Sequence, residues 1–156
     1  MFVDTRFLLK PEVPFLPGDQ SQNKKKLRAE LGNLGRRVLI LEDERLVAEN
    51  LKDLFQEFGH EVVGIAGSGE EALRLANSQN PDLMLMDIRV KGSMDGIQTA
   101  LVIHADRKVP IIFLTAHQQH NFPELSKLDP TTFVYLGKPY SKEDLIQAIR
   151  KLFPAQ

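Results

Sequence analysis

The sequence of 156 residues contains no cysteine and no tryptophan. Without cysteine there is no disulfide framework, thiolate metal site or thiol nucleophile, so any chemistry must fall to carboxylates, hydroxyls, histidines or lysines. Long hydrophobic runs are also lacking, since a stretch such as 109–114 is far shorter than the roughly 20 residues of a membrane span. The first residues lack the basic start and apolar run of a secretion signal. We therefore expect a cytoplasmic protein with no membrane partner.

Charge is distributed unevenly along the chain. Residues 1–37 contain eight Lys or Arg against four Asp or Glu, whereas residues 38–156 contain 12 against 17. The first part also contains several prolines, which interrupt regular structure, while the second has the composition of one small globular domain. We therefore divide the chain into a basic, poorly ordered extension over 1–36 and a single domain over 37–156.

The basic extension has few features of a binding module. Its densest charge is the run Lys24, Lys25 and Lys26, which has no interleaved aromatic residues. A short helix over 24–34 would carry a stripe of leucines at helical spacing, although the pattern is brief. The extension is too short and too rich in proline to be a DNA-binding domain, and the acidic remainder of the chain would repel a phosphate backbone. The leucines are Leu27, Leu31 and Leu34.

Beyond residue 37, short β-rich apolar runs alternate five times with amphipathic stretches. This alternation is typical of an α/β fold with a doubly wound parallel sheet. Most of the runs are apolar throughout, as strands covered on both faces should be, and the second run is the weakest and is placed at an edge. The expected strands are 38–41, 61–66, 82–86, 109–115 and 132–136, and the expected helices are 44–58, 68–78, 97–106, 125–128 and 141–153.

Two local patterns mark helix ends. Gly59 follows the first predicted helix and is expected to cap its C-terminus, because glycine adopts left-handed backbone angles readily. Ser141 has Asp144 three residues later, a weaker relative of the capping box. The last helix is therefore predicted to begin at Ser141.

Acidic residues follow two of the predicted strands. The first strand runs directly into Glu42 and Asp43, and the third runs into Asp87. With a strand order of 2-1-3-4-5, these two strands are neighbours, so the three carboxylates converge at the carboxyl edge of the sheet. Carboxylates this close repel one another unless a cation lies between them, and an oxygen-only cluster favours Mg²⁺. The sequence therefore predicts a magnesium site.

A hydroxyl and an ammonium group reach the same edge from the other side. The fourth strand ends in Thr115, and the fifth is followed by Lys138. A carboxylate nucleophile beside Mg²⁺, with a lysine and a hydroxyl for the phosphoryl oxygens, is sufficient to form and hydrolyse an aspartyl phosphate. Each of these residues has an ordinary structural explanation on its own, such as a solvated helix start or a turn. Their occurrence in order at four strand ends favours the chemical interpretation.

The motifs at these strand ends are highly specific as a set. They are Val-Leu-Ile-Leu-Glu-Asp at 38–43, Pro-Asp-Leu-Met-Leu-Met-Asp-Ile at 81–88, Met-Asp-Gly at 94–96, Pro-Ile-Ile-Phe-Leu-Thr-Ala at 110–116 and Tyr-Leu-Gly-Lys-Pro at 135–139. With them, about 38–153 resembles the receiver domains of two-component response regulators. The resemblance implies a flavodoxin-like (βα)5 fold with a five-stranded parallel sheet.

The resemblance also implies roles for the acidic residues. The residue matching Asp87 accepts a phosphoryl group from a histidine kinase. Those matching Asp43 and Asp87 bind Mg²⁺ directly, and the one matching Glu42 acts through water. The backbone carbonyl of the residue matching Arg89 completes the metal shell. Arg89 is also expected, together with His117, to flank the phosphoryl group and tune its lifetime.

Residues on the other side of the site match the signalling elements of the family. The residue matching Thr115 moves toward the phosphoryl group, and that matching Lys138 pairs with it. The residue matching Tyr135 changes rotamer as the signal is read out. The bond between Lys138 and Pro139 is expected to be cis.

Some positions depart from the family pattern. The loop after Asp87 is one residue longer than the commonest form and has Lys91 where proline is usual, and Glu42 replaces the commoner aspartate. The region after the fourth strand is unusual, so the fourth helix is expected to start late, with Pro123 in its first turn. His117 and His120 lie in this region, where lone histidines are more often solvated than metal-binding.

We therefore expect a stand-alone phosphoacceptor receiver that acts by binding a downstream protein. Its expected partners are a histidine kinase or phosphotransfer protein and an effector, with a homodimer kept as an option and no DNA-binding domain. It is not expected to be an enzyme beyond its own phosphorylation and dephosphorylation. One alternative is an interaction module that works without phosphorylation. Another is a metal-dependent hydrolase of small phosphates, although no second catalytic group is found.

Overall fold

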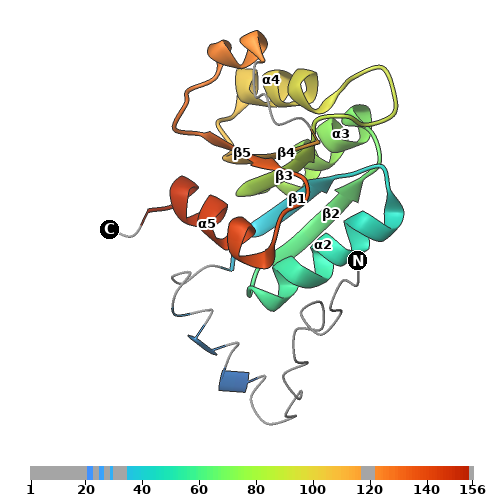
Figure 1. Cartoon of the computed structure of the whole chain (residues 1–156). Helices are drawn as coiled ribbons and strands as arrows, with labels where there is room; N and C mark the ends of the chain where they lie inside the picture. The colour runs from blue at the N-terminus through green and yellow to red at the C-terminus, as the bar shows by residue number, and fades with distance from the viewer. Residues whose placement is uncertain (1–20, 23–24, 27–28, 30–34, 117–121, 155–156) are drawn as a thin grey trace, which may run out of the picture.

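The folded chain is a parallel five-stranded sheet with helices on both faces (Figure 1). The computed structural model describes residues 21–22, 25–26, 29, 35–116 and 122–154. The strand order is β2-β1-β3-β4-β5, with all four pairings parallel, which confirms the predicted fold class and the edge position of β2. The strands are β1 (Arg37–Leu41), β2 (Glu61–Ala66), β3 (Leu83–Asp87), β4 (Ile111–Thr115) and β5 (Phe133–Gly137). The helices are α2 (Arg45–Glu57), α3 (Gly69–Gln79), α4 (Gly96–Asp106), η2 (Pro123–Lys127) and α5 (Lys142–Leu152).

Two hydrophobic cores lie on opposite faces of the sheet, because successive side chains of a strand point to opposite sides. Val38 and Ile40 of β1 pack in the core beneath α2 and α5. Leu39 and Leu41 pack in the other core, beneath α3, α4 and η2. All four side chains are fully buried. A strand that is apolar at every position therefore corresponds to one covered on both faces.

Two helices begin with a capping box. Ser141 and Asp144 form a complete capping box at the start of α5, which confirms the predicted start of that helix. A second capping box joins Asp95 and Gln98 at the start of α4. At the other end of a helix, Gly59 has φ of 91° just after α2, the left-handed conformation predicted there.

The predicted fourth helix, over 125–128, is instead the 3-10 helix η2. Its backbone bonds join residues three apart, since the Leu128 amide donates to the Leu125 carbonyl at 3.0 Å. Pro123 stands in its first turn, as predicted. Pro110 also shifts a boundary: β4 begins at Ile111, after the predicted start, because proline has no amide hydrogen for the ladder.

The two ends of the domain meet beside α5. The guanidinium of Arg36, just before β1, lies 3.4 Å from the ring centroid of Phe153, just after α5. A cation over an aromatic face is an attractive contact. The contact lies near the amino end of β1, away from the edge where the strands end (Figure 1).

Some expectations fall outside the described residues. They are the leucine stripe at Leu27, Leu31 and Leu34 and the histidines His117 and His120. Among the residues that the structure describes, no helix is long and apolar enough to cross a membrane.

Candidate functional site

The predicted site residues lie at the carboxyl edge of the sheet. β1 and β3 are paired neighbours, so Glu42, just after β1, comes beside Asp87, the last residue of β3. On the other side, the backbone amide of Lys138 donates to the carbonyl of Thr115 at 2.7 Å, which continues the β4–β5 pairing beyond the strand ends. The peptide bond between Lys138 and Pro139 is cis, as the resemblance implied.

Asp87 is held from two sides. Its Oδ2 lies 2.6 Å from Lys138 Nζ, and its Oδ1 accepts a hydrogen bond from the Arg89 amide at 2.9 Å. Burial of the ammonium opposes its charge, but the hydrogen bond to Asp87 and the charges of Asp87 and Glu42 outweigh this and raise the pKa of Lys138. Lys138 is therefore a cation at neutral pH, aimed at a carboxylate that is 8% exposed.

Glu42 is the most buried acid at this edge, with 2% of the residue exposed. One oxygen accepts a hydrogen bond from the Glu44 amide at 2.9 Å. The other accepts no hydrogen bond from any described residue and lies 3.6 Å from Lys138 Nζ. Burial, with a contribution from the charge of Asp87, raises the pKa of Glu42 to about 7. The site therefore contains a carboxylate oxygen without a donor.

Asp43 accepts a hydrogen bond from the loop after β3. Its Oδ2 accepts a hydrogen bond from the Lys91 amide at 3.2 Å. The loop returns to the sheet at Gly96, where an added Cβ would lie 2.2 Å from the Asp87 carbonyl oxygen. Only glycine fits this close approach, so the start of α4 is seated on the backbone of Asp87.

The donor set fits Mg²⁺. Glu42, Asp43 and Asp87 offer only oxygen atoms, the ligands that this hard ion prefers, and one buried oxygen of Glu42 has no hydrogen-bond donor. Mg²⁺ usually keeps several waters and takes one or two carboxylates. Within the described ranges, no three histidine or acidic side chains form a preassembled metal cluster.

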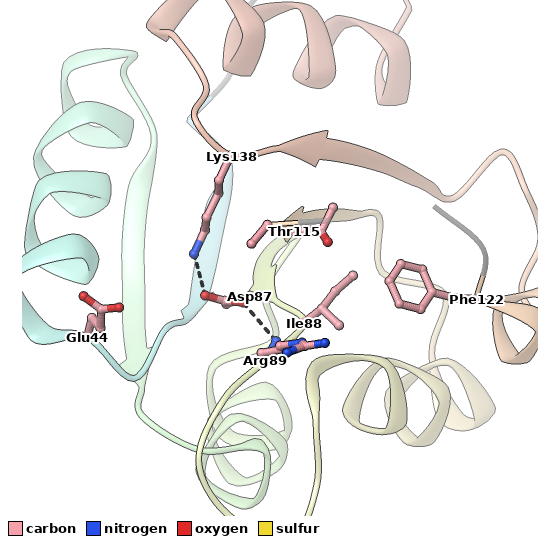
Figure 2. Close-up of a pocket in the computed structure, with 8 residues that line it drawn as sticks. Glu44, Asp87, Ile88, Arg89, Thr115, Phe122 and Lys138 are labelled. Carbon is pink, nitrogen blue, oxygen red and sulfur yellow. Dashed lines mark hydrogen bonds and ion pairs between the residues drawn. The ribbon is translucent and has the colours of Figure 1, made fainter. Parts of the chain in front are cut away.

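A pocket of about 220 Å³ opens above Asp87. Figure 2 shows Lys138 pointing at Asp87, with Thr115 and Phe122 on the other side and Arg89 below. Thr115 is buried, so its hydroxyl belongs to the pocket wall rather than to the surface. The sequence did not single out Glu44, Ile88, Ala116 or Phe122 as lining residues. The full lining is Glu44, Asp87, Ile88, Arg89, Thr115, Ala116, Phe122 and Lys138.

Tyr135 lies outside this lining, although it was predicted to report on the site. Its ring centroid is 5.8 Å from that of Phe122, which does line the pocket, and 5.9 Å from that of the fully buried Phe113. Burial raises the pKa of Tyr135. Phe122 therefore connects the pocket to Tyr135. Sequence reasoning did not find this link, because nothing in the residue pattern around Phe122 marks it as a neighbour of Tyr135.

Comparisons with known proteins agree with this geometry. A family model described as "Response regulator receiver domain" matches residues 38–150. The chain is 45% identical over 114 residues to the transcriptional regulatory protein PdtaR of Mycobacterium tuberculosis, covering 73% of this chain and 55% of that protein. It is 40% identical over 118 residues to the positive alginate biosynthesis regulatory protein of Pseudomonas aeruginosa, covering 73% of this chain and 46% of that protein.

A solved structure has the same fold. The signal receiver domain of a modulated diguanylate cyclase from Desulfovibrio desulfuricans superposes with a TM-score of 0.63 at 36% identity, covering 75% of this chain and 95% of that domain. The chain thus spans about half the length of the two curated relatives but nearly all of a solved receiver domain.

Proposed function

The chain belongs to the response regulator receiver domain family, and from that premise we propose that it accepts a phosphoryl group on Asp87 from a histidine kinase or phosphotransfer protein. An oxygen of Asp87 attacks the phosphorus of a phosphohistidine, the P–O bond forms as the P–N bond breaks, and the imidazole leaves with the electron pair. Water later attacks the phosphorus, releasing phosphate and restoring the carboxylate. The chain would act only on its own aspartate and on no separate substrate.

The observation that supports this most is the contact of 2.6 Å between Lys138 Nζ and Asp87 Oδ2 in a pocket that Thr115 also lines. The ammonium neutralises the carboxylate in the resting protein. Once Asp87 is phosphorylated, the same ammonium can turn to a phosphoryl oxygen. The Thr115 hydroxyl can donate to a second one. Fixed donors aimed at the developing charge are the main means of stabilising such a transfer.

The acidic residues would hold the metal. Asp43 and Asp87 would bind Mg²⁺ directly, the Arg89 carbonyl would complete its shell, and Glu42 would act through water. When bound, Mg²⁺ offsets the negative charge that accumulates on the phosphoryl oxygens. The orphan oxygen of buried Glu42 supports this assignment, because a metal-bound water would supply the missing donor.

Phosphorylation would change the surface on the β5 side of the sheet. An added phosphoryl charge would bias the positions of Thr115 and Tyr135, and through them the surface formed by η2, β5 and α5. A downstream protein, the kinase or a second copy of the chain would bind there. We assign this receiver to residues 37–156, place it in the cytoplasm and treat residues 1–36 as a basic extension without a DNA-binding role.

The test is the intact mass of the protein after incubation with acetyl phosphate and Mg²⁺. We expect a gain of one phosphoryl group, about 80 Da, that requires Mg²⁺ and is lost in Asp87→Asn. Asp106→Asn is the matched control, since Asp106 is exposed on α4 and pairs with Arg107 away from the pocket. No gain in the wild type would favour the interaction module that works without phosphorylation.

A further inference from the structure

The loop between β3 and α4 is tied to three carboxylates by alternate backbone amides. Each carboxylate comes from a different part of the fold: the end of β3, the residues after β1, and the first turn of α3. Two of the three belong to the proposed metal site. The pairs are Arg89 to Asp87 at 2.9 Å, Lys91 to Asp43 at 3.2 Å and Ser93 to Glu70 at 3.3 Å.

Glu70 is the anchor that lies outside the site. Its Oε1 accepts hydrogen bonds from both the amide and the hydroxyl of Ser93. The loop comes close to the first turn of α3 here, since a Cβ added at Gly92 would lie 3.0 Å from Glu70 Oε2. Gly92 also has φ of 112°, a conformation that favours glycine. The hydrogen bond from the Ser93 hydroxyl is the main cause that lowers the pKa of Glu70, so the anchor is ionised at neutral pH.

We propose that Glu70 is a positioning residue that holds this loop with the Lys91 amide on Asp43, and thereby weakens the binding of Mg²⁺. The inference rests on the proposed function, because it takes Asp43 as a metal ligand. The Lys91 amide donates to Asp43 Oδ2 at 3.2 Å, so a cation that binds on the loop side of this oxygen must displace the amide or share the oxygen with it.

The experiment is a calorimetric titration of the full chain with Mg²⁺. In Glu70→Ala, which removes the acceptor of both Ser93 hydrogen bonds, we expect the affinity to rise about fivefold, the size of one competing hydrogen bond of about 1 kcal/mol. Glu71→Ala is the matched control. It removes the same side chain and charge from the same turn of α3, but Glu71 accepts from the Gly67 amide at 2.8 Å and not from the loop. Loss of charge alone weakens cation binding, so an increase in Glu70→Ala only cannot come from the charge.

Two further tests probe the same contact. One uses a variant that keeps the net charge, and the other is measured without metal. Ser93→Ala removes the hydroxyl donor to Glu70 and leaves the net charge unchanged, and we expect a smaller rise in Mg²⁺ affinity. In metal-free protein, hydrogen exchange of the Lys91 amide should be faster in Glu70→Ala and Ser93→Ala and unchanged in Glu71→Ala, because a freed loop opens more often.

The outcomes separate the two proposals. Unchanged or weaker Mg²⁺ binding in Glu70→Ala, while Asp43→Asn loses binding, would overturn the positioning role and leave the metal site standing. Mg²⁺ binding that is the same in Asp43→Asn as in the wild type would overturn the metal assignment and the positioning role together.

Discussion

The centre of the sheet and its β5 edge differ in how firmly they are packed. Every residue of β3 is buried, whereas every residue of β5 is only partly buried. β3 lies between two paired strands, while β5 has one paired neighbour. The connection before β5 also contains the 3-10 helix η2, over Pro123–Lys127, where an α-helix over 125–128 was expected.

This difference in packing matches the different roles proposed for β3 and β5. The proposed nucleophile, Asp87, ends the strand that is buried at every position, so its geometry is held by packing on both faces. Tyr135 lies on the less covered strand, where a change of conformation disturbs fewer buried contacts. Rigid packing therefore coincides with the chemistry, and looser packing coincides with the surface proposed to pass on the signal.

Two leucines that face the same core test the contrast directly. Leu85 on β3 is fully buried, and Leu136 on β5 is partly buried against that core. We expect Leu85→Ala to lower the free energy of unfolding by about 3 kcal/mol and Leu136→Ala by about 1 kcal/mol. Urea unfolding followed by circular dichroism measures both. Equal losses would mean that β5 is packed as firmly as the centre.

Lys138 links the two regions, since it follows β5 and reaches Asp87 in the centre. We expect Lys138→Ala to slow phosphorylation by acetyl phosphate about 100-fold, the effect of removing one donor from a developing charge. Lys142→Ala is the control, because Lys142 pairs with Glu57 on the outer surface of α5 and α2. Similar labelling rates in the two variants would remove Lys138 from the proposed chemistry.

A substitution at Phe122 tests whether the surroundings of Tyr135 on β5 can be altered without slowing the phosphorylation of Asp87. Phe122→Leu shortens the side chain between the pocket and Tyr135 while keeping it apolar. The rate of phosphorylation should stay within about twofold of the wild type, and the near-ultraviolet circular dichroism of the tyrosines should change. A rate that falls as far as in Lys138→Ala would show that the ring is needed for the chemistry itself.

The smallest expected effect concerns the pH dependence of the centre in the absence of Mg²⁺. The pKa of Glu42 is raised from an ordinary 4.5 to about 7, so unfolding releases a proton between these values. The free energy of unfolding should therefore fall as the pH rises from 5 to 8, because the carboxyl ionises more readily in the unfolded chain than in the folded one. Glu42→Gln should lose this slope. Glu49→Gln, at an exposed position on α2, should keep it.

Much of the fold and of the site could be predicted from short sequence patterns. A strand that is apolar throughout and ends in Asp87 indicates both a buried strand and the place of its carboxylate. The sheet order was a condition of the argument that the resemblance to receiver domains supplied, and with it the meeting of Asp87 with Lys138 was predictable. The same holds for Ser141 and Asp144, whose spacing sets the start of α5.

Other features depend on contacts that leave little trace in the sequence. The Lys91 amide reaches Asp43 through the backbone, and any residue except proline has such a donor. The hydrogen bonds between Ser93 and Glu70 join positions 23 residues apart, and neither residue type is unusual on a surface. The contact between the rings of Phe122 and Tyr135 joins positions 13 residues apart, and the spacing of the two residues does not predict it.

The contact between Arg36 and Phe153 has a practical consequence. Because it brings the first and last residues of the folded unit together near the amino end of β1, both lie far from the carboxyl ends of the strands. A pair of fluorescent proteins fused at these positions would leave the pocket above Asp87 accessible. A circularly permuted version joined between 36 and 153 needs only a short linker, and new termini can then be opened on the η2 side to report on its movement.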